Sequence, residues 1–173
     1  WFMVAVANQS VTNGTLADPA RARSLARAGL RTAQVSVEAP DAESHDGLSA
    51  RAGSFDRTLA GIRNLQDAGI SVQTNTTVTA LNAHLAPRMP AFLKSLGVSR
   101  FAMNLYIPSG VTAAAPADPL FFPYSRIGPV IDAVRAAARA EALVFYWYSP
   151  TPHCLYNPIA HGLGNKSCAA MDG

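Results

Sequence analysis

A short motif that ends helices occurs three times in this sequence and limits the folds open to it. In each copy a leucine precedes a glycine by four residues, and an apolar residue follows that glycine at once; the copies are Leu25–Leu30, Leu65–Ile70 and Leu93–Val98. Glycine enters the left-handed conformation without a Cβ penalty, and the leucine meets the apolar residue in a Schellman ending. Each copy leads straight into an apolar segment. The repeat therefore predicts helices that alternate with the strands of a parallel sheet.

The segments around these motifs predict five strands and four helices. The expected strands are Gln9–Thr12 (within the first apolar segment, Trp1–Thr12), Ala33–Glu38, Ile70–Val78, Arg100–Leu105 and Leu143–Trp147. The expected helices are 18–28 with Asp18 as N-cap, 54–68 with Ser54 as N-cap, 82–96, and 125–142, which lacks the terminal glycine. Residues 39–53 and 106–123 are expected to be loops, and the chain is expected to be irregular from Ser149.

The strand in Ala33–Pro40 carries an unusual polar row. Side chains alternate faces along a strand, so Gln34, Ser36 and Glu38 share one face. Strands of parallel sheets are normally covered on both faces and nearly continuously apolar. A polar row that ends in serine and glutamate indicates a ligand pocket at the C-terminal end of this strand.

Neighbouring strands repeat the pattern. Asn75 and Thr77 share a face of the next strand, Asn104 lies on the strand after it, and Asn13 follows the first strand. If these faces point inward together, the polar groups meet at the C-terminal rim, where (β/α) barrels place their sites. A doubly wound sheet would instead carry a glycine-rich phosphate loop, and neither GxGxxG nor a Walker loop is present. A barrel-like α/β fold is favoured, although five strands cannot close an eight-stranded barrel.

Composition narrows the function classes. The 173 residues are 49% hydrophobic and 14% charged, as in a folded globular domain, and the net charge of +3 comes without a basic, aromatic stripe. Nucleic-acid binding is therefore not expected. No apolar run approaches the roughly 20 residues needed to cross a bilayer, and nothing at the start resembles a secretory signal. No membrane partner and a cytoplasmic location are expected.

Several segments, in order along the chain, resemble the radical S-adenosylmethionine (SAM) enzymes, particularly those with a C-terminal SPASM or twitch extension. These segments are Val11–Leu16, Val35–Pro40, His45-Asp46, Arg51–Phe55, Gly69–Val78, Asn104–Gly110 and Cys154–Cys168. The resemblance implies a partial (β/α)6 TIM-like barrel of parallel strands with outer helices over residues 1–148. It also implies the start of an iron–sulfur extension over residues 149–173.

The resemblance also implies a reaction and cofactors. Family members cleave SAM at a [4Fe–4S] cluster to a 5′-deoxyadenosyl radical, which abstracts hydrogen from a substrate. That substrate is often a peptide or protein, as in a maturase, or a small molecule such as a tetrapyrrole precursor. Tyr106, Tyr146 and Tyr148 are candidates for substrate contact. No catalytic acid or base is assigned.

By the same resemblance, six residues are assigned to SAM. Ser36 is similar to the residue that hydrogen-bonds the amino-acid end of SAM, and Arg51 to the arginine that pairs with its carboxylate; a guanidinium suits that pairing. Glu38 is expected to meet the SAM ammonium or ribose, or the substrate. The full set is Asn13, Ser36, Glu38, Arg51, Asn75 and Asn104.

The iron–sulfur ligands are incomplete in these residues. The family's CxxxCxxC motif is absent, so the chain is expected to be an inactive fragment whose main cluster ligands precede Trp1. Cys154 and Cys168 resemble the opening of a SPASM pattern for an auxiliary cluster, although Met171 stands where a further cysteine often follows. A zinc site formed by His153, Cys154, His161 and Cys168 is an alternative of unusual spacing.

Two other functions stay open. One is a (β/α)-barrel enzyme without iron that uses Glu38 as acid or base, and the other is a noncatalytic binding module. Simpler interpretations of single residues also stay open: turn chemistry for Asn13, a solvated charge for Arg51, and a surface position for His45 and His84.

Overall fold

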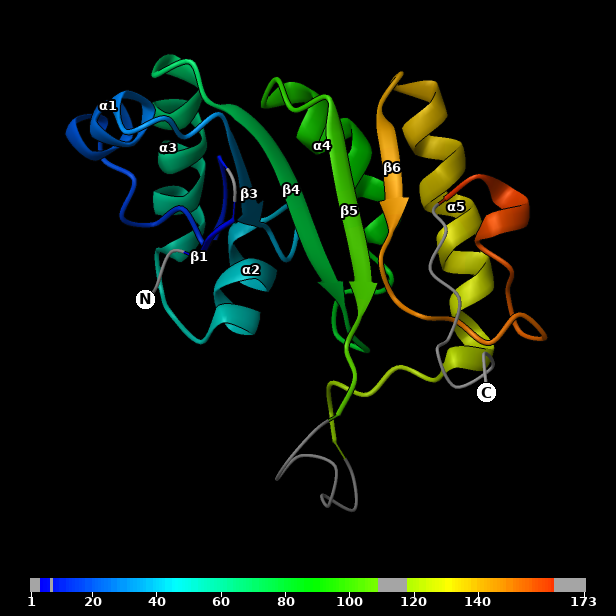
Figure 1. Ribbon diagram of the computed structural model, residues 1–173. Helices are drawn as coiled ribbons and strands as arrows, with labels where there is room; N and C mark the ends of the chain where they lie inside the picture. Colours follow the sequence, from blue (N-terminus) through cyan, green and yellow to red (C-terminus); the bar gives the residue numbers. More distant parts are fainter. Residues whose placement is uncertain (1–3, 7, 109–117, 164–173) are drawn as a thin grey trace.

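The computed structural model describes residues 4–6, 8–108 and 118–163, which form an α/β fold built on a six-stranded sheet. The strands follow one another in sequence order across the sheet, from β1 to β6. Their bounds are Val4–Val6 (β1), Gln9–Thr12 (β2), Thr32–Ser36 (β3), Ser71–Val78 (β4), Arg100–Leu105 (β5) and Val144–Trp147 (β6). β1 pairs with β2 antiparallel, and every later pair is parallel. The predicted parallel α/β fold is confirmed, and the open run of five parallel strands is consistent with a partial barrel (Figure 1).

Helices connect consecutive parallel strands, as the helix-ending motif predicted. The α-helices are Pro19–Arg27 (α1), Ala42–Ser49 (α2), Ser54–Asp67 (α3), Met89–Ser95 (α4) and Ile127–Ala140 (α5). Short 3-10 turns cover Ala86–Arg88 (η1), Tyr124–Arg126 (η3) and Ile159–His161 (η4). None of the helices in the described ranges is long and apolar enough to cross a membrane.

The three predicted helix endings are present. Gly29, Gly69 and Gly97 all have positive φ, and the amide after each glycine donates to the carbonyl of the leucine five residues earlier at 3.0–3.1 Å. α5 ends in the same way with an alanine in place of glycine. Ala142 has φ 54, and the Leu143 amide donates to the Ala138 carbonyl at 2.8 Å.

The core lies between one face of the sheet and the long helices. Val35, Phe101 and Phe145 from the strands pack in one buried cluster with Ile62 from α3 and Ile131 from α5. The opposite face carries the polar rows: the residues of β3 alternate between buried and half-buried, and the half-buried ones include Gln34 and Ser36. The predicted assignment of faces along Ala33–Glu38 is therefore correct, and the polar face is left for the site.

The predicted strand Gln9–Thr12 is confirmed as β2, and the structure adds β1 before it, with Asn8 (φ 68) turning the chain between the two. Two expectations about the N-terminal half need correction. The predicted loop 39–53 contains α2, whose N-cap Asp41 accepts from the Ser44 amide at 2.9 Å. The N-cap of α3 is Gly53 and not Ser54, which lies inside the helix with its hydroxyl bonded to Asp46.

The predicted helix from Asn82 begins later. Residues 80–85 form turns, and only η1 and α4 are helical, with Pro87 and Pro90 in their first positions. A proline suits the first turn of a helix because its missing amide hydrogen has no partner there. The Asn82 side chain is instead buried in a hydrogen-bond network at the end of β4.

Candidate functional site

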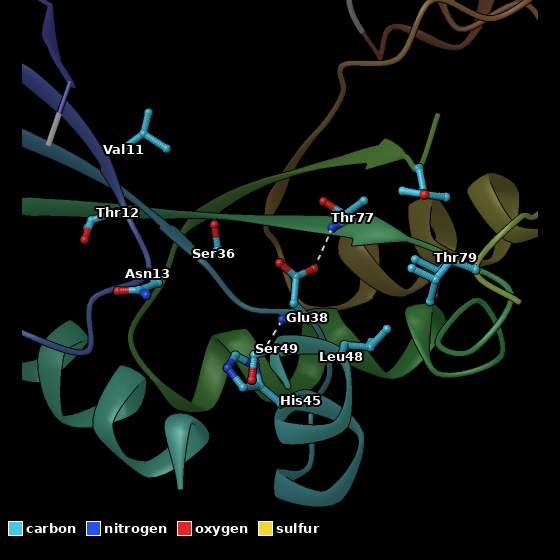
Figure 2. Close-up of a pocket in the computed structure, with 12 residues that line it drawn as sticks. Val11, Thr12, Asn13, Ser36, Glu38, His45, Leu48, Ser49, Thr77 and Thr79 are labelled. Atoms are coloured by element: carbon cyan, nitrogen blue, oxygen red, sulfur yellow. Dashed lines mark hydrogen bonds between the residues drawn. The ribbon is translucent and has the colours of Figure 1, made fainter. Parts of the chain in front are cut away.

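A pocket of about 550 Å³ lies at the C-terminal ends of β2, β3 and β4, the rim that the polar rows predicted (Figure 2). Two lining residues come from beyond β5, and three come from α2. The lining residues are Val11, Thr12, Asn13, Ser36, Glu38, His45, Leu48, Ser49, Thr77, Thr79, Tyr106 and Leu120. Of the six residues predicted to bind SAM, the structure brings Asn13, Ser36 and Glu38 into this lining.

Asn13 reaches the pocket from the turn after β2. Its Oδ1 accepts from the amide and hydroxyl of Thr15 at 3.2 and 3.0 Å, so turn chemistry occupies this oxygen. Its backbone carbonyl accepts from the Thr58 hydroxyl of α3 at 2.9 Å. Gly14 follows with φ 74, a conformation that favours glycine. The turn and α3 together fix Asn13.

Ser36 is the last residue of β3 and pairs in register with Asn75 of β4. The Asn75 side chain donates to Asn104 Oδ1 at 2.6 Å, and Asn104 lies opposite Thr77. The three polar residues therefore form a continuous row across the open face, as predicted. Asn75 and Asn104 lie next to the lining and are not part of it.

Glu38 lies two residues past the end of β3, and its carboxyl group enters the pocket. Its Oε2 accepts from the Thr77 amide at 2.9 Å (Figure 2). No lysine or arginine is among the pocket residues of the described chain. Burial raises the pKa of the Glu38 carboxyl to about 7, against the opposing effect of the Thr77 amide. The pocket therefore holds one carboxyl group that changes charge near neutral pH.

His45 was expected at the surface, and that expectation is wrong. The residue is only 3% exposed and lines the pocket, and its ring accepts at Nδ1 from the Glu38 amide at 3.2 Å. Burial lowers the pKa of His45, with the nearby Asp46 acting in the opposite direction. The imidazole is therefore neutral at pH 7, with its Nε2 carrying the hydrogen.

Asp46 anchors α2, the helix that carries His45, onto α3. Its carboxylate accepts from the Gly53 and Phe55 amides and the Ser54 hydroxyl, the last two at 2.8 Å. These bonds, led by that of the Phe55 amide, hold the pKa of Asp46 below its usual value. A carboxylate at the start of a helix satisfies amides that have no partner within the helix. His45 and Ser49 are thereby fixed at the pocket wall.

The remaining predicted residues lie elsewhere. Arg51 is exposed and is not part of the lining. Cys154 is exposed, and Cys168 lies outside the described residues. Within the described part of the chain, no three His, Cys, Asp or Glu residues lie close enough to hold a metal ion. His161, a member of the alternative zinc set, contacts Arg135 at 3.1 Å and stacks on Tyr156.

Two groups of tyrosines lie along the open face. Tyr106 lines the pocket and donates its hydroxyl to Asp118 at 2.9 Å. Tyr146 and Tyr148 stack on each other with their ring centroids 6.2 Å apart, and Tyr146 pairs in register with Ala102 of β5. Substrate contact by these three residues stays a prediction.

Comparisons with known proteins show similarity to radical SAM proteins. Residues 7–82 match the family model described as the radical SAM superfamily. The AdoMet-dependent heme synthase of Nitratidesulfovibrio vulgaris is 36% identical over 136 residues, which cover 79% of this chain and 33% of the relative. The PqqA peptide cyclase of Granulibacter bethesdensis is 28% identical over 90 residues, which cover 52% of this chain and 24% of that relative. The chain thus spans a third or less of these relatives.

The fold resembles that of Streptococcus suis SuiB. The TM-score is 0.64 at 16% sequence identity, and the match covers 84% of this chain and 33% of that one. SuiB has also been solved bound to S-adenosylmethionine and bound to the precursor peptide SuiA. At this identity the likeness shows the fold alone.

Proposed function

We propose that this chain is the SAM-binding part of a radical SAM enzyme and that the pocket holds SAM. The observation that carries the proposal is the overlap of the family match with the pocket. Residues 7–82 include every lining residue except Tyr106 and Leu120. Sequence similarity and cavity therefore coincide on the same three strand ends.

The pocket suits a ligand of this size and polarity. Its volume of about 550 Å³ falls within the range of small-molecule sites, roughly 300–1,000 Å³. In the proposed complex, the Ser36 hydroxyl hydrogen-bonds the amino-acid end of SAM. The Glu38 carboxylate faces a positively charged group, and Asn13 contributes its amide at the opposite wall. Asn75 and Asn104 extend this polar surface toward the ribose and adenine.

Arg51 keeps its proposed role as the partner of the SAM carboxylate. It lies two residues after the end of α2, the helix that supplies His45, Leu48 and Ser49 to the pocket. The exposed guanidinium has no hydrogen bond of its own among the described contacts, so it is available to a ligand carboxylate.

In this superfamily a [4Fe–4S] cluster and SAM together supply the radical that removes a hydrogen atom from the substrate. The residues present do not fit such a cluster, because the sequence has two cysteines and the described part has no group of three metal ligands. The role of this chain in the proposal is therefore to bind and orient SAM and to present the open sheet face to substrate.

The relatives suggest the substrate class. The 36%-identical relative is named a heme synthase, which favours a tetrapyrrole. A peptide is the second candidate, supported by the relative named a peptide cyclase. In either case, we propose that the substrate meets Tyr106, Tyr146 and Tyr148. Residues 149–173 with Cys154 and Cys168 remain a proposed SPASM-like segment.

SAM binding tests the proposal directly. Calorimetric titration of the purified protein with SAM should give saturable binding, and Ser36→Ala should raise the dissociation constant about tenfold, the cost of one hydrogen bond to a charged group. Ser71→Ala is the matched control, since Ser71 is an exposed strand serine outside the pocket. No binding by the wild-type protein, or equal losses in both variants, would contradict the proposal. Because this chain does not itself fit the cluster, iron analysis after anaerobic reconstitution must be done on the complete enzyme of the proposal, and there it separates the proposal from the iron-free alternative.

A further inference from the structure

Glu38 lies where the sheet no longer fixes the chain. β3 and β4 pair up to Ser36 and Asn75, and the Val37 amide still donates to the Asn75 carbonyl at 3.0 Å. Beyond this point, hydrogen bonds of side chains take the place of the backbone hydrogen bonds between β3 and β4. The Thr76 hydroxyl donates to the Val37 carbonyl at 2.7 Å, and the Thr77 amide donates to the Glu38 carboxyl group. The backbone of Glu38 therefore needs another anchor.

Asn82 supplies this anchor. Its Nδ2 donates to the carbonyls of Glu38 at 2.8 Å and Thr77 at 2.9 Å. Its Oδ1 accepts from the amide and hydroxyl of Thr79 at 2.7 and 3.2 Å. The two carbonyls need a donor and the Thr79 amide needs an acceptor, so the side-chain amide of Asn82 can take only this orientation. The residue is 2% exposed, and both amide hydrogens and both lone pairs of the side-chain oxygen are used in these hydrogen bonds.

The Glu38 backbone is thus held on both sides by side chains. His45 accepts from its amide, and Asn82 donates to its carbonyl. His45 is itself a pocket residue, whereas Asn82 does not line the pocket. Asn82 is also the last residue of the family match, although it is not among the six residues that the sequence analysis assigned to SAM.

We propose that Asn82 is a positioning residue that holds the Glu38 carboxyl group in the pocket by joining the ends of β3 and β4. The other titratable groups facing Glu38 are His45 from α2 and Tyr106 after β5. The effect of Asn82 on SAM binding rests on the proposed function, but its effect on the position and titration of Glu38 does not. The proposed function and the positioning role of Asn82 can therefore fail separately.

The experiment measures the titration of Glu38 by NMR on protein labelled with carboxyl-¹³C glutamate. The Glu38 signal is the one missing in Glu38→Gln. In Asn82→Ala the Glu38 side chain should move toward solvent. The pKa of Glu38 should then fall from about 7 by at least about 1, because desolvation is the main cause of the raised pKa. Asn82→Ser keeps one hydrogen-bonding group, so its Glu38 pKa should lie between those of the wild type and Asn82→Ala.

The matched control is Asn64→Ala. The side-chain amide of Asn64 in α3 also donates to a backbone carbonyl, that of Ala17 at 2.8 Å, but this bond does not involve Glu38. It should leave the pKa of Glu38 unchanged. An unchanged Glu38 pKa in folded Asn82→Ala and Asn82→Ser proteins would overturn the proposal. Failure of both variants to fold would also overturn it, since Asn82 would then serve the whole fold.

A second readout addresses SAM. If the wild-type protein binds SAM, Asn82→Ala should weaken binding about tenfold, and this loss should shrink in the Glu38→Gln background because both changes act through one group. Additive losses would contradict a role through Glu38. Failure of the wild-type protein to bind SAM would refute the proposed function and leave the NMR result standing.

Discussion

Gly61 is the point where α3 touches the turn that carries Asn13. A Cβ atom built on Gly61 would lie 2.1 Å from the Gly14 carbonyl oxygen and 2.9 Å from its carbon. These are backbone atoms, so a side chain cannot rotate to relieve the overlap. Gly14 is also closely packed, because a Cβ atom built on it would lie 3.1 Å from Val35 Cγ1 and 3.6 Å from the Thr58 carbonyl oxygen of α3. Gly61→Ala should therefore separate α3 from the turn.

The magnitude follows from the overlap. Real Cβ contacts stay beyond 3.0 Å, so α3 and the turn must separate by about 1 Å, an overpacking that costs about 1–3 kcal/mol. The separation also weakens the Thr58–Asn13 hydrogen bond, worth about 1 kcal/mol. Alanine returns nearly 1 kcal/mol of helix propensity. The net loss is about 2 kcal/mol, or a melting temperature lower by about 4–8 °C.

Gly47→Ala is the matched control, since Gly47 also lies within a helix and its Cβ would meet nothing within 4 Å. This change should raise stability by about 0.5–1 kcal/mol. Chemical denaturation and thermal melts of both variants measure the difference. A Gly61→Ala protein as stable as the wild type would refute the close contact. Equal losses in both variants would show that glycine flexibility, and not packing, is the cause.

Two further predictions concern a charge and a helix end. Because burial raises the Glu38 pKa to about 7 from 4.5, ionised Glu38 lowers stability as pH rises through that window. The stability advantage of Glu38→Gln over the wild type should therefore grow by about 1–3 kcal/mol from pH 5 to pH 8, measured by denaturant titration. An advantage that does not change with pH would contradict the raised pKa. Ala142→Gly should stabilise by about 0.5–1 kcal/mol, since Ala142 has φ 54, whereas Ala136→Gly within α5 should destabilise by about 1 kcal/mol. Equal melting temperatures in these two variants would oppose the assigned strain.

The helix ends and strand faces could be predicted from the sequence because both depend on local chemistry. The Leu25–Leu30 motif closes its own Schellman bonds within six residues. The alternation from Ala33 to Glu38 needs only the geometry of a strand. α5 shows the limit of such rules, since Ala142 takes the place of the expected glycine and the helix still ends in the same way.

Helix α2, and with it the pocket position of His45, was not predicted because this helix has little apolar periodicity. Its one buried residue is His45, and its position depends on Asp46 bonding to α3. A usable signal was present: Asp41 is an N-cap residue, with Glu43 in the first helical turn. An acidic first turn after an aspartate indicates a helix start even where hydrophobic periodicity does not.

The electrostatics of the pocket depend on contacts between residues far apart in the sequence. Glu38 bonds to Thr77 and Asn82, 39 and 44 residues further along the chain, so its burial and raised pKa follow from the tertiary structure alone. With a neutral His45 beside it and no lysine or arginine among the described lining residues, the ionised carboxylate has no positive partner in that lining. A cationic ligand would supply that partner and lower the Glu38 pKa. Binding of such a ligand below pH 7 must therefore release a proton, which is the linkage expected if the ligand is the sulfonium and ammonium compound SAM.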